Sequence, residues 1–314
     1  MTSNDPLVLV TGASGFVGRC VTARLTARGI RYRTTGRGDL PGSPDHVITE
    51  PLSAETDWQD ALAGVDRIIH LAGRVHVMAE TERDPLALYR KTNRDGTEAL
   101  LRQAKAAGVR RFLFVSTIKA TGRETGDNLP EVLGQAPSDP YALSKFEAEK
   151  LVLEAASESF SAAVIRPPLV YGPGVGANFR ALMKLADSPY PLPLGFACEP
   201  RSLVYVENLA DALLHLILEA PAPEGIYHVK DPTETGINDL IRDLRRAYGR
   251  PARLLPVPTG LLRLLGRLAG RTEQVRRLLD RLTFADENLR RRGWQAPYTR
   301  SDALARMVEA SPKD

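Results

Sequence analysis

The sequence predicts an α/β protein built on a doubly wound parallel sheet with a smaller second lobe, and three observations support this prediction. Short apolar runs alternate with longer amphipathic stretches through the first half of the chain. The first apolar run leads directly into a glycine-rich turn at 11–18 and then into a helix-like stretch. After residue 166 the composition changes to loops rich in Pro and Gly. Strands and helices in strict alternation imply right-handed crossovers and therefore parallel strands.

The individual elements follow from the apolar runs and from helical spacing. The apolar runs predict strands at 7–10, 65–71, 111–115 and 162–165. The amphipathic stretches predict helices at 19–28, 85–107 and 141–158. The run 203–206 and a helix at 206–220 look like a return to the main sheet. The prediction therefore assigns 1–166, with about 201–220, to the sheet domain, and 167–200 and 221–314 to a smaller C-terminal, substrate-binding lobe.

The glycine-rich turn after the first strand predicts a dinucleotide site, which makes the expected fold Rossmann-type. Its glycines permit a tight turn, close approach of the backbone to a pyrophosphate and close packing of the following helix, whose N-terminus attracts the anion. The residues expected to contact the cofactor here are Gly12, Ser14, Gly15, Phe16, Val17 and Gly18.

A tyrosine and a lysine four residues apart strengthen this prediction. Tyr141 and Lys145 occupy positions i and i+4 of the helix expected at 141–158, so their side chains share one helical face. There a phenol can act as a general acid or base, while the neighbouring ammonium lowers its pKa. The alternative is an exposed pair on an ordinary amphipathic helix, and the preceding glycine turn favours the catalytic pair.

The composition is that of a globular protein without a stripe of basic residues. The 314 residues carry a net charge of +4, but Arg alternates with Asp and Glu, so we expect no nucleic-acid partner. The same balance suits a substrate that carries phosphates. The first expected strand begins by residue 7 with no signal segment before it, which favours the cytoplasm. Cys20 and Cys198 predict packed thiols rather than a disulfide scaffold.

Leucines at helical spacing, with arginines between them, fill the stretch 259–282. A helix that lies on a membrane surface would use this pattern. A helix of the smaller lobe that buries its leucines and exposes its arginines would use it too, and we favour this second interpretation. No run approaches the roughly 20 apolar residues of a membrane span, so we expect no spanning helix.

Several short segments match one known family in the same order. They are 11–18, His70-Leu71-Ala72-Gly73, Asn93-Arg94-Asp95-Gly96-Thr97, 114–117, Tyr141 with Lys145, 166–174, 201–206 and Gly293-Trp294. Over nearly its whole length the chain resembles the extended short-chain dehydrogenase/reductase family, of the NAD-dependent epimerase/dehydratase type. The resemblance implies an enzyme that uses a nicotinamide cofactor on a nucleotide sugar.

The resemblance also implies a catalytic set. It suggests that Tyr141 transfers the proton, that Lys145 lowers the pKa of Tyr141 and binds the nicotinamide ribose, and that Thr117 positions the sugar oxygen. Asn93 matches the residue that orients the lysine in relatives. The further residues that the resemblance assigns to the cofactor are Leu71, Ala72, Gly73 and Asn93.

The end of the second expected strand bears on the choice of cofactor. Gly36 stands where this family commonly has Asp, and Arg37 follows it. A carboxylate there would hold the ribose hydroxyls of NAD, whereas an arginine can pair with the 2′-phosphate of NADP in a bidentate manner. We therefore favour NADP(H), with NAD as the alternative, and expect no metal. The resemblance places Glu50 near the adenine.

The resemblance points to substrate contacts in the smaller lobe. Arg201 begins the strand whose counterpart supplies an arginine to the nucleotide diphosphate, and Asn178 matches a polar residue near the same group. A second diphosphate arginine is expected shortly before Gly293. The family signature for it is missing, and Arg277 and Arg281 are the candidates.

Departures from the family pattern bear on the reaction. Ile118 and Lys119 stand where the 4,6-dehydratases have Asp-Glu, so the sequence excludes dehydration. Leu169 replaces an Asn that is common in 4-epimerases. Lys119 either lies on the surface or faces the polar edge of the substrate. His76, in the loop 74–78, either contacts the substrate or is structural.

These observations favour NADPH-dependent reduction at C4 of a UDP-4-keto-6-deoxy sugar, of the N-acetylated hexose type, in the synthesis of a surface polysaccharide. The alternative is a UDP-glucose or UDP-N-acetylglucosamine 4-epimerase that retains NAD. The set Thr117, Tyr141 and Lys145 fits both reactions. A third, remote alternative is a non-catalytic NADP-sensing protein, although such proteins commonly lose the Tyr or the Lys.

The helices expected at 85–107 and 141–158 also predict a homodimer. In relatives the corresponding helices pair across a two-fold axis into a four-helix bundle, an isologous contact. The apolar residues expected to provide this contact are Leu86, Leu88, Ala99, Leu100, Phe146, Leu151 and Leu153.

Overall fold

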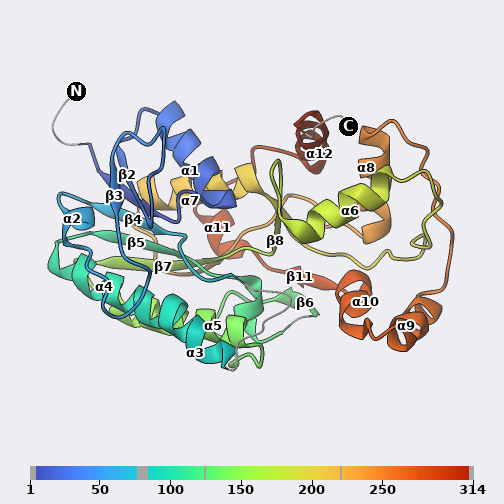
Figure 1. Cartoon of the computed structure of the whole chain (residues 1–314), viewed down its shortest axis with the longest axis horizontal. Helices are drawn as coiled ribbons and strands as arrows, with labels where there is room; N and C mark the ends of the chain where they lie inside the picture. The colour runs from blue at the N-terminus through green and yellow to red at the C-terminus, as the bar shows by residue number, and fades with distance from the viewer. Residues whose placement is uncertain (1–4, 76–83, 124, 220, 311–314) are drawn as a thin grey trace.

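The central feature of the fold is a seven-stranded sheet. A computed structural model describes residues 5–75, 84–123, 125–219 and 221–310 of the chain (Figure 1). The sheet order is β10-β7-β5-β4-β1-β2-β3, and every neighbouring pair is parallel. Its strands are β1 (Val8–Thr11), β2 (Tyr32–Gly36), β3 (His46–Ile48), β4 (Arg67–His70), β5 (Arg111–Val115), β7 (Ser161–Arg166) and β10 (Gly225–His228). The predicted doubly wound parallel sheet is confirmed.

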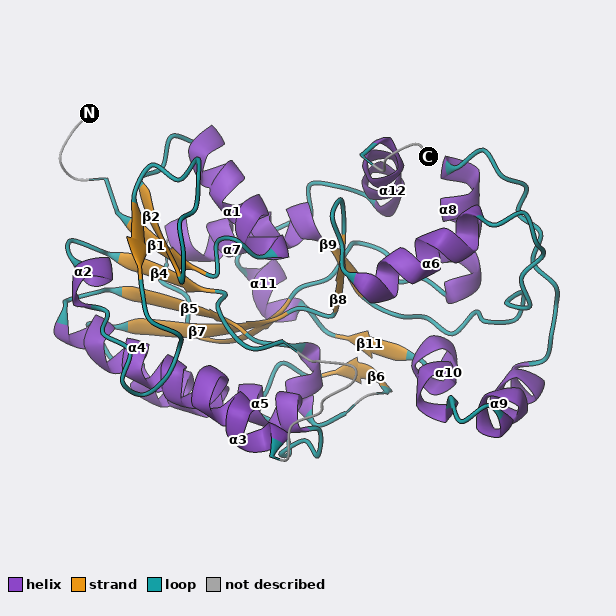
Figure 2. Cartoon of the chain, in the orientation of Figure 1, coloured by secondary structure: helices purple, strands orange, loops and turns teal. Residues whose placement is uncertain are grey.

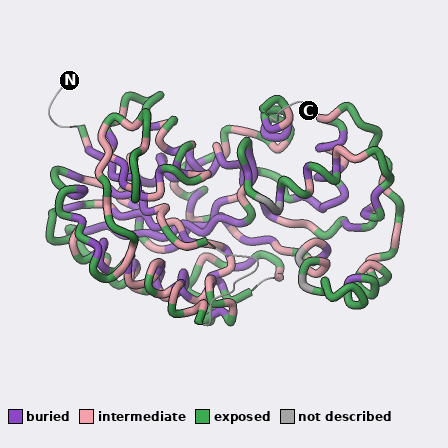
Figure 3. The backbone as a smooth tube through the Cα atoms, in the orientation of Figure 1, coloured by how far each residue is buried: buried purple, intermediate pink, exposed green. Residues whose placement is uncertain are grey.

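Helices cover both faces of this sheet, and its central strands are therefore buried on both faces. One face packs against α1 (Phe16–Ala27) and α7 (Val206–Leu218), and α11 (Glu287–Arg291) joins the same core. The other face packs against α2 (Gln59–Leu62), α4 (Gly96–Ala106) and α5 (Pro140–Ala155) (Figure 2). All residues of β1 and β7 are buried, and Figure 3 shows the buried segments gathered along the strands of the sheet.

The stretch predicted as one helix over 85–107 consists of consecutive helical segments. The segment α3 (Pro85–Tyr89) begins at Asp84, whose side chain accepts a hydrogen bond from the backbone N–H of Ala87. A π-helical segment, η1 (Arg90–Asp95), connects α3 to α4. Such segments are rare and occur frequently at functional sites. In this chain η1 carries the buried Asn93.

A second lobe with its own apolar core lies beyond the carboxyl ends of the sheet strands (Figure 1). Two short parallel sheets, β8-β9 and β6-β11, lie between it and the main sheet. These strands are β6 (Gly126–Leu129), β8 (Leu169–Tyr171), β9 (Leu203–Tyr205) and β11 (Leu282–Phe284). The remaining helices are η2 (Ile118–Thr121), α6 (Ala177–Asp187), α8 (Ile237–Ala247), α9 (Thr259–Leu268), α10 (Thr272–Leu279) and α12 (Arg300–Glu309).

The chain returns to the main sheet differently from the prediction. The expectation that 203–206 rejoins that sheet is wrong, because β9 pairs with β8. The return is made by α7, which packs on α1, and by β10, which pairs with β7 at the edge of the main sheet. A three-residue apolar run carries no information about its pairing partner, which is why the sequence misplaced it. The proposed limits of the two domains stay a prediction.

Four of the five leucines of α9 face solvent, contrary to the preferred interpretation for this part of the leucine-rich stretch, whereas Leu262 of α9 and Leu279 of α10 pack in the core of the smaller lobe as expected. The exposed fractions are 47% for Leu261, 52% for Leu264 and Leu265, and 77% for Leu268. The helix buries Gly266 instead, and a Cβ at that position would lie 2.6 Å from Cγ2 of Val275 in α10. Within the described ranges, no helix is long and apolar enough to cross a membrane.

The apolar residues expected to join two copies are covered largely within one chain. Ala99, Leu100 and Phe146 are buried, because α3, η1, α4 and α5 pack on one another. The four other positions, Leu86, Leu88, Leu151 and Leu153, are half-buried. The homodimer therefore stays a prediction, and only these half-buried positions remain to supply its contact.

Candidate active site

The glycine-rich turn brings the start of α1 close to the end of β4. Gly12 has a φ of +71°, and a Cβ there would lie 2.7 Å from the backbone nitrogen of Ala72. A Cβ on Gly18 would overlap the carbonyl oxygen of Gly12. The N-cap residue of α1 is Gly15, which has no side chain to cap the helix. The first N–H groups of α1 are thus suited to an anion.

A cavity of about 800 Å³ opens beside this turn. It lies at the carboxyl end of the sheet, where the strand order reverses between β1 and β4, the position at which open α/β sheets bind ligands. The predicted site residues that line this cofactor cavity are Gly12, Ser14, Gly15, Phe16, Val17, Gly18, Arg37, Leu71, Ala72, Gly73, Thr117, Tyr141 and Lys145. Segments far apart in the sequence therefore meet as expected, while the role of each residue stays a prediction.

The N-terminus of α5 positions Tyr141. Asp139 is the N-cap residue, and its Oδ1 accepts a hydrogen bond from the backbone N–H of Ala142 at 2.8 Å. Pro140 occupies the first turn, where its missing N–H costs nothing. The Tyr141 ring packs edge to face on Tyr89, with 5.7 Å between ring centroids. The phenol is thus fixed one residue into a well-capped helix.

One turn further along α5, Lys145 is almost fully buried under the cavity. Its exposed fraction is 4%. Its Nζ donates a hydrogen bond to the carbonyl of Val115 at 2.8 Å, and it lies 3.9 Å from the centroid of the Phe114 ring. The end of β5 therefore holds the ammonium in place by a carbonyl and an aromatic face.

A buried histidine joins several elements beneath the site. His70 ends β4, and its Nδ1 lies 2.7 Å from the hydroxyl of Thr11 and its Nε2 3.0 Å from that of Thr97. Its ring stacks on Phe114 with 5.6 Å between centroids. Burial, aided by the charge of Lys145, lowers the pKa of His70 to about 3. The imidazole is therefore neutral, and it ties β1, β4 and α4 together without adding a charge.

Burial dominates the ionisation of the Tyr-Lys pair. Burial is the largest cause that raises the pKa of Tyr141 to about 12, followed by Asp139 and Tyr89. Burial lowers the pKa of Lys145 to about 7, against an opposing effect of Glu149. Each shift favours the neutral form of its group. Lys145 is not among the causes of the Tyr141 shift, and its expected lowering of that pKa stays a prediction.

Two hydroxyls follow β5 at the cavity wall. Thr117 is the N-cap residue of η2, and its Oγ1 accepts a hydrogen bond from the backbone N–H of Lys119 at 3.4 Å. Ser116 also lines the cavity, and its buried Oγ has no hydrogen-bond partner among the described residues. A buried hydroxyl of this kind needs a partner, which points to a bound ligand. Ser116 was not predicted as a site residue, although it lies in the matched segment 114–117.

Asn93 ties the loop after β4 to α5. Its Oδ1 accepts a hydrogen bond from the backbone N–H of Arg74 at 2.8 Å, and its Nδ2 donates to the Arg74 carbonyl at 3.1 Å. The same Nδ2 donates to Oγ of Ser144 at 3.0 Å. Because Ser144 directly precedes Lys145, these contacts suit the expected orienting role. Asn93 itself does not line the cofactor cavity, whereas Thr92 does.

The outer end of the cavity lies where β2 ends. Arg37 is exposed there and lines the cavity, as do Glu50 and Leu52. Trp58 also lines it, with an exposed fraction of 1% and an indole N–H that has no partner in the described part of the chain. A buried Trp usually finds such a partner. Trp58 was not predicted as a site residue, because no local sequence pattern reveals that its N–H is buried beside a cavity.

The residues expected to contact the substrate do not line this cavity. Lys119 and Arg201 are half-buried and lie outside its lining. The Arg201 guanidinium donates to the carbonyl of Asp280, and burial lowers its pKa. His76 lies outside the described residues, and so do the side chains of Asn178 and Arg277. Their substrate roles stay predictions.

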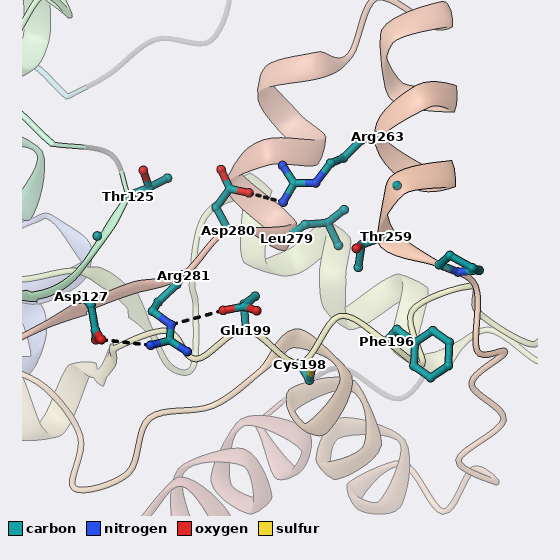
Figure 4. A pocket seen from close by; sticks show the side chains of 13 residues that line it. Thr125, Asp127, Phe196, Cys198, Glu199, Thr259, Arg263, Leu279, Asp280 and Arg281 are labelled. Atoms are coloured by element: carbon teal, nitrogen blue, oxygen red, sulfur yellow. Dashed lines mark hydrogen bonds and ion pairs between the residues drawn. The ribbon is translucent and has the colours of Figure 1, made fainter.

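A second cavity, of about 680 Å³, lies in the smaller lobe between β6, α9 and the end of α10 (Figure 4). Arg281 extends into it and forms ion pairs with Asp127 at 3.0 Å and Glu199 at 3.2 Å. Arg263 pairs with Asp280 at 2.6 Å. Arg281 is thus a candidate diphosphate arginine that lines a cavity, but carboxylates already occupy its guanidinium.

The cofactor cavity offers the groups that a nicotinamide dinucleotide requires. A helix N-terminus with a glycine cradle, in which a Cβ would clash, suits a pyrophosphate. The unpartnered Ser116 hydroxyl and Trp58 indole N–H can each bond a ligand atom. Residues of this chain therefore fit such a group.

Known proteins resemble this chain along nearly its whole length. The model described as "NAD dependent epimerase/dehydratase family" matches residues 8–229. The chain is 36% identical to a UDP-glucose 4-epimerase from Vibrio cholerae over 313 residues, 96% of this chain and 94% of that protein. It is 26% identical to the N-acetyl-alpha-D-glucosaminyl-diphospho-ditrans,octacis-undecaprenol 4-epimerase of Escherichia coli O157:H7, over 98% of this chain and 95% of that protein.

Among solved structures, the chain is similar to the UDP-N-acetylglucosamine 4-epimerase from Bacillus cereus. The TM-score is 0.77, and the match covers 97% of this chain and 99% of that one. The sequence identity is 16%, so this likeness shows the fold alone.

Proposed function

The chain belongs to the NAD dependent epimerase/dehydratase family, as an enzyme of the extended short-chain dehydrogenase/reductase type, and from this premise we propose that it is a nucleotide-sugar 4-epimerase. The observation that carries the proposal is the meeting of Tyr141, Lys145 and Thr117 around one cavity with the glycine cradle. The identity of 36% over 96% of the chain to a UDP-glucose 4-epimerase supports it. The sequence alone favoured the reductase, whereas the similar proteins support the epimerase better.

Different residues of the cofactor cavity would bind different parts of the dinucleotide. Gly12, Gly15 and Gly18 would let the pyrophosphate approach the N-terminus of α1, and Lys145 would bind the nicotinamide ribose. Ser116 and Trp58 supply further donors. When bound, such a cofactor accepts a hydride from C4 of the sugar and returns it.

Tyr141 would transfer the proton. As the C4 hydroxyl is oxidised to a ketone, the Tyr141 oxygen would take up its proton, and it would give the proton back when the ketone is reduced. Thr117 would hold the same sugar oxygen by a hydrogen bond. With a pKa of about 12 the phenol is protonated at neutral pH, so the oxidative half-reaction needs a nearby positive charge. The protonated form of Lys145, about half of that group at neutral pH because its pKa is about 7, would supply this charge. Return of the hydride to the opposite face of C4 inverts that centre without net redox change.

The experiment separates the epimerase from its competitor by nucleotide content and by product. The purified protein is heat-denatured and the supernatant assayed for NAD, and the native protein is incubated with UDP-glucose and followed by NMR. Stoichiometric NAD and formation of UDP-galactose are expected. A protein free of nucleotide that leaves UDP-glucose and UDP-N-acetylglucosamine unchanged would refute the proposal.

The second candidate is the NADPH-dependent 4-keto reductase, which Arg37 specifically favours. This exposed arginine at the end of β2 lines the cofactor cavity and can pair with a 2′-phosphate. NADPH would be oxidised as a 4-keto sugar gains a hydride at C4 and a proton from Tyr141. Consumption of NADPH with a UDP-4-keto-6-deoxy sugar, by protein that releases no nucleotide on heating, would select this reaction.

We also propose a homodimer through α3, α4 and α5. The half-buried Leu86 and Leu88 lie on α3, Leu151 and Leu153 lie on α5, and these four residues would supply the apolar contact. Light scattering at micromolar concentration should give twice 34.4 kDa. A mass of one chain would refute the proposal.

A further inference from the structure

The outward face of α9 is the most apolar helix surface that the described residues leave uncovered. Leu261, Leu264, Leu265 and Leu268 follow the spacing i, i+3, i+4 and i+7, which places them on one stripe. Their exposed fractions run from 47% to 77%. A helix of a globular lobe ordinarily buries such a stripe, whereas α9 packs on the lobe through Leu262 and Gly266 and leaves these four leucines exposed.

The orientation of α9 is fixed by its contact with α10. The backbone at Gly266 approaches Val275 so closely that a Cβ would lie 2.6 Å from Cγ2 of that valine. Rotating the helix to bury its leucines would bring a larger side chain to this contact. Single exposed leucines are common on protein surfaces, whereas a continuous apolar stripe marks an interaction site.

The chain segment that carries this stripe has basic residues and no acidic residue of its own. Residues 249–272 contain no Asp or Glu and hold Arg250, Arg253, Arg263, Arg267 and Arg271. Arg250 pairs with Asp187 and Arg263 with Asp280, both carboxylates from other segments. Arg253, Arg267 and Arg271 form no ion pair with any described residue. An apolar stripe flanked by arginines calls for a partner that is both apolar and anionic.

We propose that α9 docks on the anionic surface of a phospholipid bilayer. The leucines of its outward stripe enter the boundary between headgroups and acyl chains, and Arg267 and Arg271 contact the phosphates. A second copy of the chain is the poorer occupant, because it would set like-charged arginines against one another. Docking would also hold the second cavity at the membrane surface, since Thr259, Gly260 and Arg263 of α9 line that cavity. This inference does not depend on the proposed function.

Figure 1 shows that α9 is free to make this contact. The helix lies at the end of the molecule remote from the seven-stranded sheet, beside α10. In Figure 3 the corresponding part of the tube is drawn mostly as exposed. A flat surface could therefore approach α9 without meeting the sheet domain.

The test is co-sedimentation of the full chain with vesicles of phosphatidylcholine, made with and without phosphatidylglycerol. Binding is expected to the anionic vesicles and to be weaker at high salt. The variant L264Q/L265Q/L268Q should lose at least about tenfold in partition coefficient. Leu185→Gln is the matched control, because Leu185 is a leucine of the same lobe on α6 and is 41% exposed. Its binding should equal that of the parent. Unchanged thermal midpoints would show that all variants fold.

A second pair of variants tests the charges. Arg267→Gln and Arg271→Gln should each weaken binding to anionic vesicles by about fivefold. Equal binding to neutral and anionic vesicles, or full binding by the leucine variant, would overturn the proposal. Self-association would overturn it too. In that case the mass measured by light scattering would grow with protein concentration and depend on the three leucines, while the protein would not bind vesicles, because the stripe would join two copies.

Discussion

The cofactor cavity and the second cavity are built from different kinds of sequence and hold their charges differently. The cofactor cavity collects short contiguous segments at the ends of adjacent parallel strands, and it keeps Ser116 and Trp58 without partners among the described residues. The second cavity collects residues from four separate stretches, and carboxylates already pair with Arg281 and Arg263. The cofactor cavity therefore has polar atoms that a ligand can bind directly. A ligand of the second cavity must instead compete with existing ion pairs.

This difference sets the size of the effects expected from mutations in each cavity. A buried polar group that loses its ligand costs more than a half-exposed ion pair that rearranges in solvent. Substitutions in the cofactor cavity should therefore change turnover or cofactor affinity strongly. Substitutions in the second cavity should change substrate affinity modestly.

The largest effect is expected at Tyr141. Tyr141→Phe removes only the phenolic oxygen and should lower kcat by about 10²- to 10⁴-fold, because proton transfer is lost. Affinity for the nicotinamide nucleotide should stay within a few-fold of the parent, since the ring and its contact with Tyr89 remain. The measurement is steady-state turnover together with nucleotide binding by fluorescence. Near-parental turnover would remove Tyr141 from the mechanism.

The second-largest effect is expected at Arg37, at the outer end of the cofactor cavity. Arg37→Asp should weaken NADPH by about tenfold to a hundredfold, because repulsion replaces a charge-assisted pair with the 2′-phosphate, and it should change NADH much less. Arg31→Asp is the control, since Arg31 is also exposed but precedes β2. Titration calorimetry with both nucleotides measures the two affinities. Equal losses would show that Arg37 does not bind the phosphate.

The sequence predicted the cofactor cavity well because the determinants of its fold are local. A strand, a glycine turn and a helix are adjacent in sequence between residues 8 and 27, and the spacing of Tyr141 and Lys145 is fixed by one helix. Parallel strands then bring such segments to the same edge. Thr117 was predicted as a site residue from the family resemblance, and in the structure it lines the cofactor cavity.

The sequence predicted the smaller lobe poorly because its determinants are pairings between distant segments. The strand β9 is a three-residue apolar run whose partner β8 lies more than thirty residues earlier, and no periodicity identifies that partner. The exposed face of α9 depends on the contact between Gly266 and Val275, which a helical pattern does not reveal. Trp58 and Ser116 were not predicted as site residues for a related reason. Whether a polar atom lacks a partner depends on packing between distant segments, which a local pattern does not reveal.

A third prediction uses the buried lysine of the cofactor cavity. The pKa of Lys145 is lowered from 10.5 to about 7, so between these values the unfolded chain holds more protons than the folded one. The free energy of unfolding therefore gains from this group as pH rises from about 7 towards 10. Lys145→Met should remove that gain, so the variant should be more stable relative to the parent at pH 7 than at pH 10.

Denaturant titrations at both pH values measure this difference. Lys150→Met is the control, because Lys150 lies on the same helix but is exposed. It should show the same difference from the parent at either pH. A Lys145→Met variant that behaves like this control would show that the lysine is charged in the folded protein throughout the range.

The smallest effect is expected in the second cavity. If Arg281 contacts the diphosphate of the substrate, Arg281→Gln should raise KM for the nucleotide sugar while kcat and cofactor affinity stay unchanged. The rise should be about fivefold or less, because the guanidinium is half-exposed and already shared between Asp127 and Glu199, and such pairs contribute little. The control is Arg291→Gln, which breaks a comparable exposed pair with Glu287 in α11, away from the lining of either cavity. A change in kcat, or equal KM values for the two variants, would place the diphosphate elsewhere. Competition between the substrate and the existing ion pairs of the second cavity would then not occur at Arg281.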